Sequence, residues 1–293
     1  MTNKGLVVVN AYGVLPPIEH LISRLKEEFL DFDVELDVRS AGDVLAWIGQ
    51  EGWVYHWHLP YDFCIYLDKD PYLSILLEKS GLRLFNSSEA VRICDDKMMT
   101  YAHLAHRYIR MPVTIHSPLK YLKAENPSFL EQVKGKISFP MVAKLNYGSR
   151  GEGVFLIKDE KELSAFEKKH EFEPHQYQEF IDAHKGCDYR VIVIGGKAIA
   201  SMKRESSGDF RSNIALGAKA TAIALPPDYL KMAEEAANAI KLDYCGVDIL
   251  EGAHGEPYLC EVNSNAFIDG IEKATGLNIA WVYAYYIAHE IYK

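Results

Sequence analysis

Two oxygen-bearing side chains interrupt an apolar run near the C-terminal end of the chain. In LCEVNSNAF, residues 259–267, Glu261 and Asn263 stand two positions apart, so on a β-strand both point to the same face. The preceding run YCGVDIL contains Asp248, and the stretch EGAHGEP between the runs predicts a hairpin that brings the three side chains together. Carboxylate and carboxamide oxygens suit a hard cation such as Mg²⁺. A half-exposed strand with a solvated polar face explains the same alternation, so both interpretations stay open here.

A glycine-rich loop follows a strand that ends in a lysine. The loop NYGSRGEG, residues 146–153, carries Gly148, Gly151 and Gly153, and glycines let backbone N–H groups approach phosphate oxygens closely. It lies between two expected strands and lacks a Gly-Lys-Ser/Thr ending that leads into a helix, which excludes a P-loop. Lys144 ends the apolar strand PMVAK just before it, and a lysine buried there needs an anion such as a phosphate. The alternatives are a plain hairpin turn and a lysine whose ammonium reaches solvent.

Basic side chains gather between this loop and the acidic hairpin. Arg190 and Asp188 share one face of an expected strand, Arg204 ends the partner strand, and the segment FRSN adds Arg211 and Asn213. Arginine suits the bidentate recognition of carboxylate and phosphate. The sequence therefore predicts an anion pocket beside the cation pocket, with an ordinary surface ion pair as the alternative for each arginine.

The elements that must position these residues change character along the chain. Through residue 85, short apolar strands alternate with amphipathic helices, which predicts a small parallel α/β layer. One helix is expected over residues 86–108, where Asn86 or Ser87 can cap its first turn. From about residue 110, strand pairs, Gly-rich turns and single helices predict an α+β body that includes a hairpin turning at Gly195–Gly196.

Composition indicates an ordinary, acidic globular chain. Of its 293 residues, 41 are acidic and 32 basic, giving a formal net charge of −9, so neither nucleic acid nor a membrane is expected as a partner. Five cysteines without CxxC spacing predict buried thiols, no disulfides and a cytoplasmic location. No apolar run approaches the roughly 20 residues of a membrane span. The aromatic segment IAWVYAYYIAHEIY is expected to form a packed terminal helix, which could serve an interface in a homo-oligomer.

An ordered set of segments carries a family resemblance. These segments are NSSEAVRICDDK, FPMVAKLNYGSRGEGVFLI, YQEFID, GCDYRVIVIGGKAIASMKRES, GDFRSN, CGVDIL, LCEVN and GIEKATGLNIA. The set resembles the RimK-type ATP-grasp carboxylate–amine ligases, which include ligases that add glutamate to a ribosomal protein's C-terminus or to coenzymes, and the carrier-protein ligases of lysine biosynthesis. It extends from about residue 86 to 285. The resemblance implies an α/β N-terminal domain, residues 1–95, followed by an α+β ATP-grasp fold whose two subdomains, residues 96–181 and 182–293, clasp ATP.

The resemblance also implies a role for each matching residue. Lys97 and Lys144 would contact the ATP phosphates. The loop Gly148–Gly153 would fold over the phosphates as a lid. Asp248, Glu261 and Asn263 would hold two Mg²⁺ ions, for which Mn²⁺ could substitute. The residues implied in nucleotide binding are Lys97, Lys144, Tyr147, Gly148, Ser149, Gly151, Gly153, the adenine-binding hinge Gln178, Glu179, Phe180 and Ile181, and Asp188. The residues implied at the γ-phosphate and the activated carboxylate are Arg190, Arg211 and Asn213.

The implied reaction is ATP-dependent amide formation through an acylphosphate, most simply the addition of glutamate or another amino acid to a peptide, protein or small-molecule acceptor. Two departures concern the substrates. The family often reads Asn-Ala-Ser-Pro-Gly after its metal-binding Glu-Val pair, whereas this chain reads NSNAFIDG with the bulky Phe267. A basic-glycine patch common in relatives is reduced here to Lys219. The identity of both substrates therefore stays open, as does single addition or polymerisation. The alternatives are a small dipeptide ligase and an ATP-binding regulatory or scaffold protein without turnover.

Overall fold

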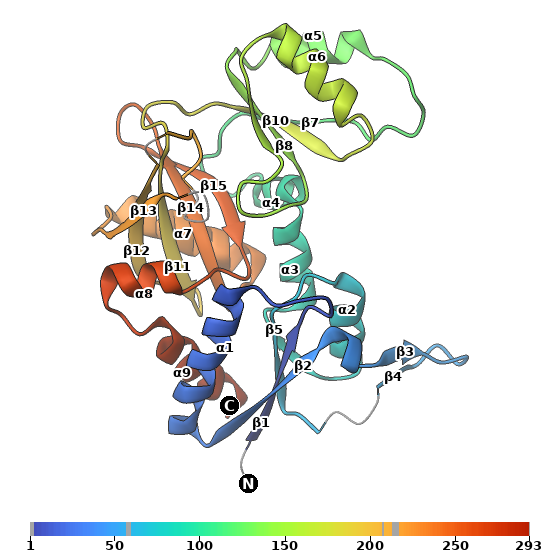
Figure 1. Ribbon diagram of the computed structural model, residues 1–293, viewed down its shortest axis with the longest axis vertical. Coiled ribbons are helices and arrows are strands. Elements are labelled where there is room, and N and C mark those ends of the chain that lie inside the picture. Colours follow the sequence, from blue (N-terminus) through green and yellow to red (C-terminus); the bar gives the residue numbers. More distant parts are fainter. Residues whose placement is uncertain (1–2, 57–59, 207, 213–216, 293) are drawn as a thin grey trace.

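The structure is a computed structural model that describes residues 3–56, 60–206, 208–212 and 217–292. Its first unit is a parallel sheet formed by β1 (Asn3–Val9), β2 (Val34–Ser40), β5 (Phe63–Tyr66) and β6 (Arg83–Phe85). The spatial order of the strands is β2-β1-β5-β6 (Figure 1). Two helices, α1 (Pro16–Glu28) and α2 (Pro71–Lys79), connect β1 to β2 and β5 to β6. The parallel α/β layer predicted for this part of the chain is confirmed.

The winding of this sheet creates a crevice between β1 and β5. From β1 the chain runs through α1 and the 3₁₀ turn η1 (Phe29–Phe32) to β2 on one side, whereas from β5 it runs through α2 to β6 on the other. Where the winding direction reverses, the carboxyl ends of neighbouring strands border a crevice that commonly binds ligands. Asn10 directly follows β1 and Asp68 lies two residues beyond β5, so both stand at this crevice.

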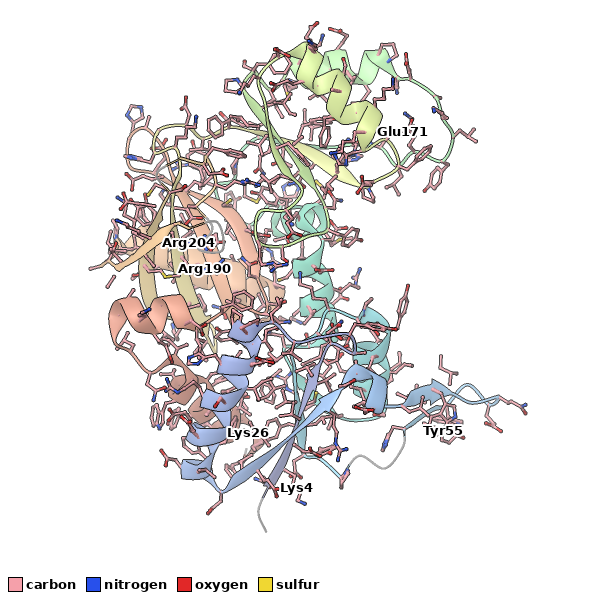
Figure 2. All side chains as sticks on the ribbon, viewed as in Figure 1. Lys4, Lys26, Tyr55, Glu171, Arg190 and Arg204 are labelled. Carbon is pink, nitrogen blue, oxygen red and sulfur yellow. The ribbon has the colours of Figure 1, made fainter. Side chains whose placement is uncertain are left out.

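A short hairpin projects from the first unit. The 3₁₀ turn η2 (Ala41–Asp43) leads into β3 (Ala46–Ile48), which pairs with β4 (Val54–His56). The rings of Trp47 and Tyr55 stack with centroids 5.8 Å apart. The hairpin extends away from the rest of the molecule in Figures 1 and 2, where Tyr55 is labelled.

The single helix predicted over residues 86–108 is wrong, because the structure has two helices, α3 (Ser88–Asp95) and α4 (Lys97–Leu104). Between them Asp96 adopts an extended conformation (φ −98°, ψ 109°) and its carboxylate accepts a hydrogen bond from the Met99 N–H at 3.0 Å. Aspartate competes in this way for the free N–H groups at a helix start. The break places Lys97 on the first turn of α4.

A second sheet forms the lobe at the top of Figure 1. Its antiparallel strands are β7 (Thr114–His116), β10 (His175–Glu179), β8 (Met141–Leu145) and β9 (Val154–Ile157), in that spatial order. Two helices, α5 (Pro127–Lys134) and α6 (Glu160–Lys169), pack against it, since Val133, Leu163 and Phe166 share one hydrophobic cluster with Ala143 and Tyr177 of the strands. This sheet gives the glycine-rich loop between β8 and β9 a rigid base.

A third, antiparallel sheet carries the polar residues of interest. Its strands in spatial order are β13 (Lys219–Ala222), β12 (Lys197–Glu205), β11 (Cys187–Ile194), β14 (Tyr244–Glu251) and β15 (Pro257–Asn263). The predicted turn between β11 and β12 is confirmed at Gly195 and Gly196, whose φ angles are +56° and +75°. One face is covered by α7 (Pro227–Ile240) and the other by α8 (Asp269–Thr275). The predicted α+β body is thus confirmed.

The C-terminal helix joins the third sheet to the first unit. In α9 (Ile279–Ile291), Tyr283 and Ile287 share one hydrophobic cluster with Leu21 and Leu25 of α1 and with strand residues of the first and third sheets. Arg24 of α1 reinforces this contact by donating to Asn278, the N-cap of α9, at 2.8 Å, and it also donates to Glu272 of α8 at 2.9 Å. The terminal helix is therefore packed, as predicted. None of the helices within the described residues combines the length and apolar character needed to cross a membrane.

Candidate active site

The predicted hairpin of β14 and β15 brings the three expected cation ligands together. Asp248 lies opposite Glu261 in the strand register, and Asn263 Nδ2 lies 3.4 Å from Asp248 Oδ2. Asp248 is 3% exposed, whereas the side chain of Glu261 is 29% exposed and has its Oε1 3.6 Å from Lys97 Nζ. Glu261 is therefore the accessible carboxylate of the group, and Asp248 is the buried one.

Asp248 is also part of a buried charge network across the third sheet. Arg190 donates from Nε and Nη2 to the two oxygens of Asp248, both at 2.7 Å. Arg204 Nη2 lies 3.0 Å from Asp248 Oδ2, and Arg204 Nε donates to Asp188 Oδ1 at 2.6 Å. The strand register explains these pairs, because Arg190 is the cross-strand partner of Asp248 and Asp188 that of Arg204. Figure 2 marks both arginines on this sheet.

Burial and the neighbouring charges shift the pKa values of the residues in this network. Burial raises the pKa of Asp188, and the nearby Arg204 only partly opposes that effect. Burial also acts to raise the pKa of Asp248, but the Arg190 and Arg204 guanidiniums together outweigh it and hold that pKa below its usual range. Burial acts to lower the pKa of Arg204, but Asp248 and Asp188 more than compensate and raise it. Asp248 is thus held ionised between two charged guanidiniums.

The donor set fits a hard divalent cation. Asp248, Glu261 and Asn263 offer the carboxylate and carboxamide oxygens that Mg²⁺ prefers. Within the part of the chain that the structure describes, no three His, Cys, Asp or Glu side chains gather as a metal site, so a cation here depends on Asn263 beside the two carboxylates. Because the oxygens of Asp248 already accept hydrogen bonds from Arg190, a cation would share or compete for them.

The two predicted phosphate lysines enter one cavity between the second and third sheets, which we call the first cavity. Both Lys97 and Lys144 are only 8% exposed. Lys97 Nζ donates to the Gly148 carbonyl at 2.7 Å. Lys144 Nζ has the Cys260 Sγ atom 3.9 Å away, and no carboxylate among the described residues forms an ion pair with it. A buried ammonium without a carboxylate favours an anionic ligand.

The glycine-rich loop lies against this cavity. Gly148, Gly151 and Gly153 have φ angles of +127°, +80° and +74°, a region that residues with a side chain seldom adopt. The loop is held by Lys97 and by Arg211, whose Nη1 donates to the Gly151 carbonyl at 2.8 Å. Lys97 and Arg211 are thus engaged by loop carbonyls, so phosphate oxygens would take the place of those acceptors.

The end of β10 borders the same cavity where the chain crosses to the third sheet. The four residues predicted as the adenine hinge, Gln178, Glu179, Phe180 and Ile181, all line it. Apolar walls come from Val142, Val154 and Leu250. A flat aromatic base would find apolar contact on two sides and backbone polar groups at its edge, which is the usual make-up of such a site.

Some predicted nucleotide-binding residues lie elsewhere or have other partners. Tyr147 is exposed and, like Gly148 and Gly153, does not contribute to the lining of the first cavity, and Gly148 lines the second cavity described below. Asp188 lines it, but its carboxylate binds Arg204, so its direct effect is on that guanidinium. Asn213 lies outside the described residues.

A second cavity of about 620 Å³ adjoins the first and shares Ser149, Arg204 and Glu261 with it. Arg190 and Asn263 also line it. Its other walls come from the carboxyl ends of β1 and β5, the start of α1, and the segment after β15.

Sequence reasoning missed the N-terminal residues of the second cavity, including Asn10, Asp68 and Lys69. Asn10 Nδ2 donates to Asp68 Oδ1 at 3.2 Å, which links the ends of the two strands. A signal was available, since each of these polar residues closely follows a buried apolar strand of the α/β layer, where ligand crevices form.

Comparison with known proteins agrees with this site. Residues 94–287 match the RimK-like ATP-grasp domain family. A probable alpha-L-glutamate ligase of Pseudomonas aeruginosa is 38% identical over 218 residues, covering 72% of this chain and 68% of that protein. Human beta-citrylglutamate synthase B is 33% identical over 215 residues, covering 72% of this chain and 54% of that protein. The chain thus spans about half the length of the human relative.

Solved structures resemble the whole chain, including its first 85 residues. D-cycloserine synthetase DcsG gives a TM-score of 0.75 at 14% identity, covering 99% of this chain and 100% of that one. The ATP-grasp ligase PsnB in complex with a minimal precursor gives 0.72 at 16% identity, covering 100% and 99%. At these identities the likeness shows the fold alone. Together with the family match, it establishes that the chain has the ATP-grasp fold and belongs to the RimK-like ATP-grasp family of ligases.

Proposed function

We propose that this protein is an ATP-dependent carboxylate–amine ligase that forms an amide bond through an acylphosphate of its substrate. The observation that carries the proposal is the meeting of the two cavities at Ser149, Arg204 and Glu261. The buried lysines lie on one side of this junction, and space for an organic substrate lies on the other. Relatives named as a glutamate ligase and a citrylglutamate synthase support the same class of reaction.

The residues of the chain contribute charge and position. Lys97 and Lys144 place buried positive charge at the triphosphate, and Arg190 faces the second cavity, where it can orient the substrate carboxylate for attack on the γ-phosphate. The glycine-rich loop and Arg211 keep water from the transferring phosphoryl group. Mg²⁺ held by the hairpin trio of Asp248, Glu261 and Asn263 would neutralise the charge on the phosphate oxygens. The resulting acylphosphate then reacts with an amine, and ADP and phosphate leave.

No covalent intermediate on the enzyme is part of the proposal. The two cysteines that line the first cavity, Cys187 and Cys260, are poor nucleophiles at neutral pH because burial raises the pKa of each thiol to about 11. Burial likewise raises the pKa of Cys94, which lines the second cavity. Activation of the substrate carboxylate therefore explains the site better than a cysteine acyl-enzyme.

Further features complete the proposal. We infer that the enzyme uses two Mg²⁺ ions, which Mn²⁺ can replace. We also infer that it joins an amino acid to an amine or a peptide. Five free cysteines favour a cytoplasmic location. The partly exposed, stacked rings of Trp281 and Tyr285 on α9 favour a homo-oligomer. Residues 1–95, 96–181 and 182–293 are the proposed domains.

Isotope transfer tests the reaction. A screen of ADP release over amino acids with amine and peptide acceptors first identifies an active pair. With ¹⁸O in the carboxylate of that substrate, one labelled oxygen should pass to inorganic phosphate. Labelled AMP with pyrophosphate would refute the acylphosphate route, and amide product with no label in any phosphate species would refute carboxylate activation. Glu261→Gln serves as the control without turnover.

A further inference from the structure

The second cavity is lined by charged and by apolar side chains, which we call its charged end and its apolar end; the two adjoin where Arg190 is the cross-strand partner of Met202. The charged end adjoins the nucleotide cavity and presents Arg190, Glu261 and Asn263. Resting on the ligase function proposed above, we propose that one of the two joined substrates is an amino acid with an apolar side chain, and that its side chain fills the apolar end. A side-chain carboxylate, as in glutamate, is excluded there.

The apolar end is built by two segments far apart in the sequence. The start of α1 and the loop before it contribute one wall, consisting of Val14, Leu15, Pro16, Pro17 and Ile18. The facing wall consists of Met202 on β12 and of Ala266 and Phe267 after β15. A leucine-like or methionine-like side chain would bury its surface between these walls, whereas a carboxylate would lose water against side chains that offer no hydrogen-bond donor.

Each Lys or Arg that lines this cavity within the described residues has a carboxylate partner. Arg190 and Arg204 belong to the buried network with Asp248. Lys69 pairs with Asp95. Arg150 sits on the glycine-rich loop, with Nη2 3.5 Å from Glu152 Oε1. The walls formed by residues 13–18 and 266–270 carry no Lys or Arg.

The remaining charges near the apolar end are acidic. Asp68 lies at the end of the β5 crevice and Asp269 at the first turn of α8, and both line the cavity. Among the described residues, the ion-pair partner of Asp269 is His20, whose Nε2 lies 3.5 Å from Asp269 Oδ1. Two carboxylates at one cavity disfavour a third on the ligand by like-charge repulsion. The same NSNAFIDG segment that departs from the family pattern therefore supplies both the apolar surface of Phe267 and the acid Asp269.

Calorimetric titration of the full chain tests this inference apart from turnover. The protein is saturated with Mg²⁺ and a non-hydrolysable ATP analogue, then titrated separately with L-leucine, L-lysine and L-glutamate. L-leucine should bind at least about tenfold tighter than L-glutamate. Equal or tighter binding of glutamate, no detectable binding of leucine, or lysine binding tighter than leucine would overturn the inference. The isotope-transfer experiment is independent, so either idea can fail alone.

Substitutions on the wall sharpen the test. Phe267 is half-buried at the cavity and Leu15 is partly exposed there, so Phe267→Lys and Leu15→Lys each place a cation on the apolar wall with little risk to the fold. Each should weaken leucine binding and strengthen glutamate binding. Phe172→Lys, a change at an exposed phenylalanine that does not line the cavity, is the matched control. An unchanged leucine-to-glutamate affinity ratio in both wall variants would also overturn the inference.

Discussion

Arg204 is the residue at which the buried charge network can be tested most directly. Its side chain is 3% exposed and that of Asp188 is 8% exposed. Arg204→Met removes the guanidinium and keeps an unbranched side chain of similar reach. Asp188 then loses its arginine partner, and Asp248 keeps Arg190 and the weaker contact with Asn263. Removal of one partner from a buried pair costs about 3–5 kcal/mol, because the other charge stays buried without compensation.

An exposed ion pair of the same chain provides the scale. Arg92 and Glu89 form an i,i+3 pair on α3 with side chains 44% and 63% exposed, and such pairs contribute about 0–1 kcal/mol. Arg92→Met should therefore leave the free energy of unfolding almost unchanged. A domain's total stability is about 5–15 kcal/mol, so the loss expected for Arg204→Met is a large part of it.

The loss of unfolding free energy expected for Arg204→Met should also depend on pH. Burial already raises the pKa of Asp188, and removing Arg204 raises it further. A carboxyl group whose pKa is higher in the folded than in the unfolded protein binds its proton more strongly when folded, so stability falls as pH rises through that range and returns as pH falls. The difference in unfolding free energy between wild type and Arg204→Met should therefore be smaller at about pH 5 than at about pH 8.

Urea unfolding followed by circular dichroism measures these quantities for wild type, Arg204→Met, Arg92→Met and the double variant Asp188→Leu with Arg204→Met. The double variant restores the charge balance and leaves Arg190 with Asp248, so it should recover at least about half of the loss. A loss in Arg204→Met no larger than that in Arg92→Met would refute the reasoning. So would a loss that does not change with pH.

Two further predictions concern the ligands. Glu261→Gln should abolish ADP release while changing the free energy of unfolding by no more than about 0.5–1 kcal/mol, because it removes the negative charge of a partly exposed cation ligand. Normal turnover at ordinary Mg²⁺ concentration would be evidence against the site. Amide hydrogen exchange across residues 146–153 should slow when Mg²⁺ and a non-hydrolysable ATP analogue are added, because phosphate orders the loop; equal exchange rates in the two states would contradict the lid.

Local sequence pattern was sufficient for the hairpin trio and for the order of the layers. Alternation placed Glu261 and Asn263 on one face, and the short connection to the preceding strand placed Asp248 opposite them. These are properties of single strands and hairpins. The parallel first unit followed from alternating strands and helices for the same reason. The break at Asp96 was missed because helical periodicity continues across it, while capping by the aspartate decides the boundary.

Long-range pairing could not be predicted in the same way. Which carboxylate each arginine binds depends on the register of β12, β11 and β14, where Arg190 meets Asp248 and Arg204 reaches both Asp188 and Asp248. The second cavity depends on the packing of α1 against α9, which brings residues 13–18 close to residues 266–270. Neither arrangement can be recognised from the pattern of any single segment of the sequence.

The contacts that Lys97 and Lys144 make within the protein determine how much each lysine should contribute to nucleotide binding. Lys97 and Lys144 are equally buried, but Lys97 donates to the Gly148 carbonyl and lies 3.6 Å from Glu261, so a phosphate at Lys97 replaces contacts that already exist. Within the described residues, Lys144 Nζ has the Cys260 thiol beside it and no carboxylate partner, so a phosphate there would pair with a buried charge. Lys144→Met should therefore weaken binding of a non-hydrolysable ATP analogue more than Lys97→Met does. It should also raise the free energy of unfolding without nucleotide by roughly 1–3 kcal/mol, because an apolar side chain replaces the unpaired ammonium.

Calorimetry and urea unfolding of the two variants provide the comparison. Weaker binding in Lys97→Met than in Lys144→Met, or a nucleotide-free Lys144→Met protein less stable than wild type, would show that Lys144 is already compensated in the folded chain.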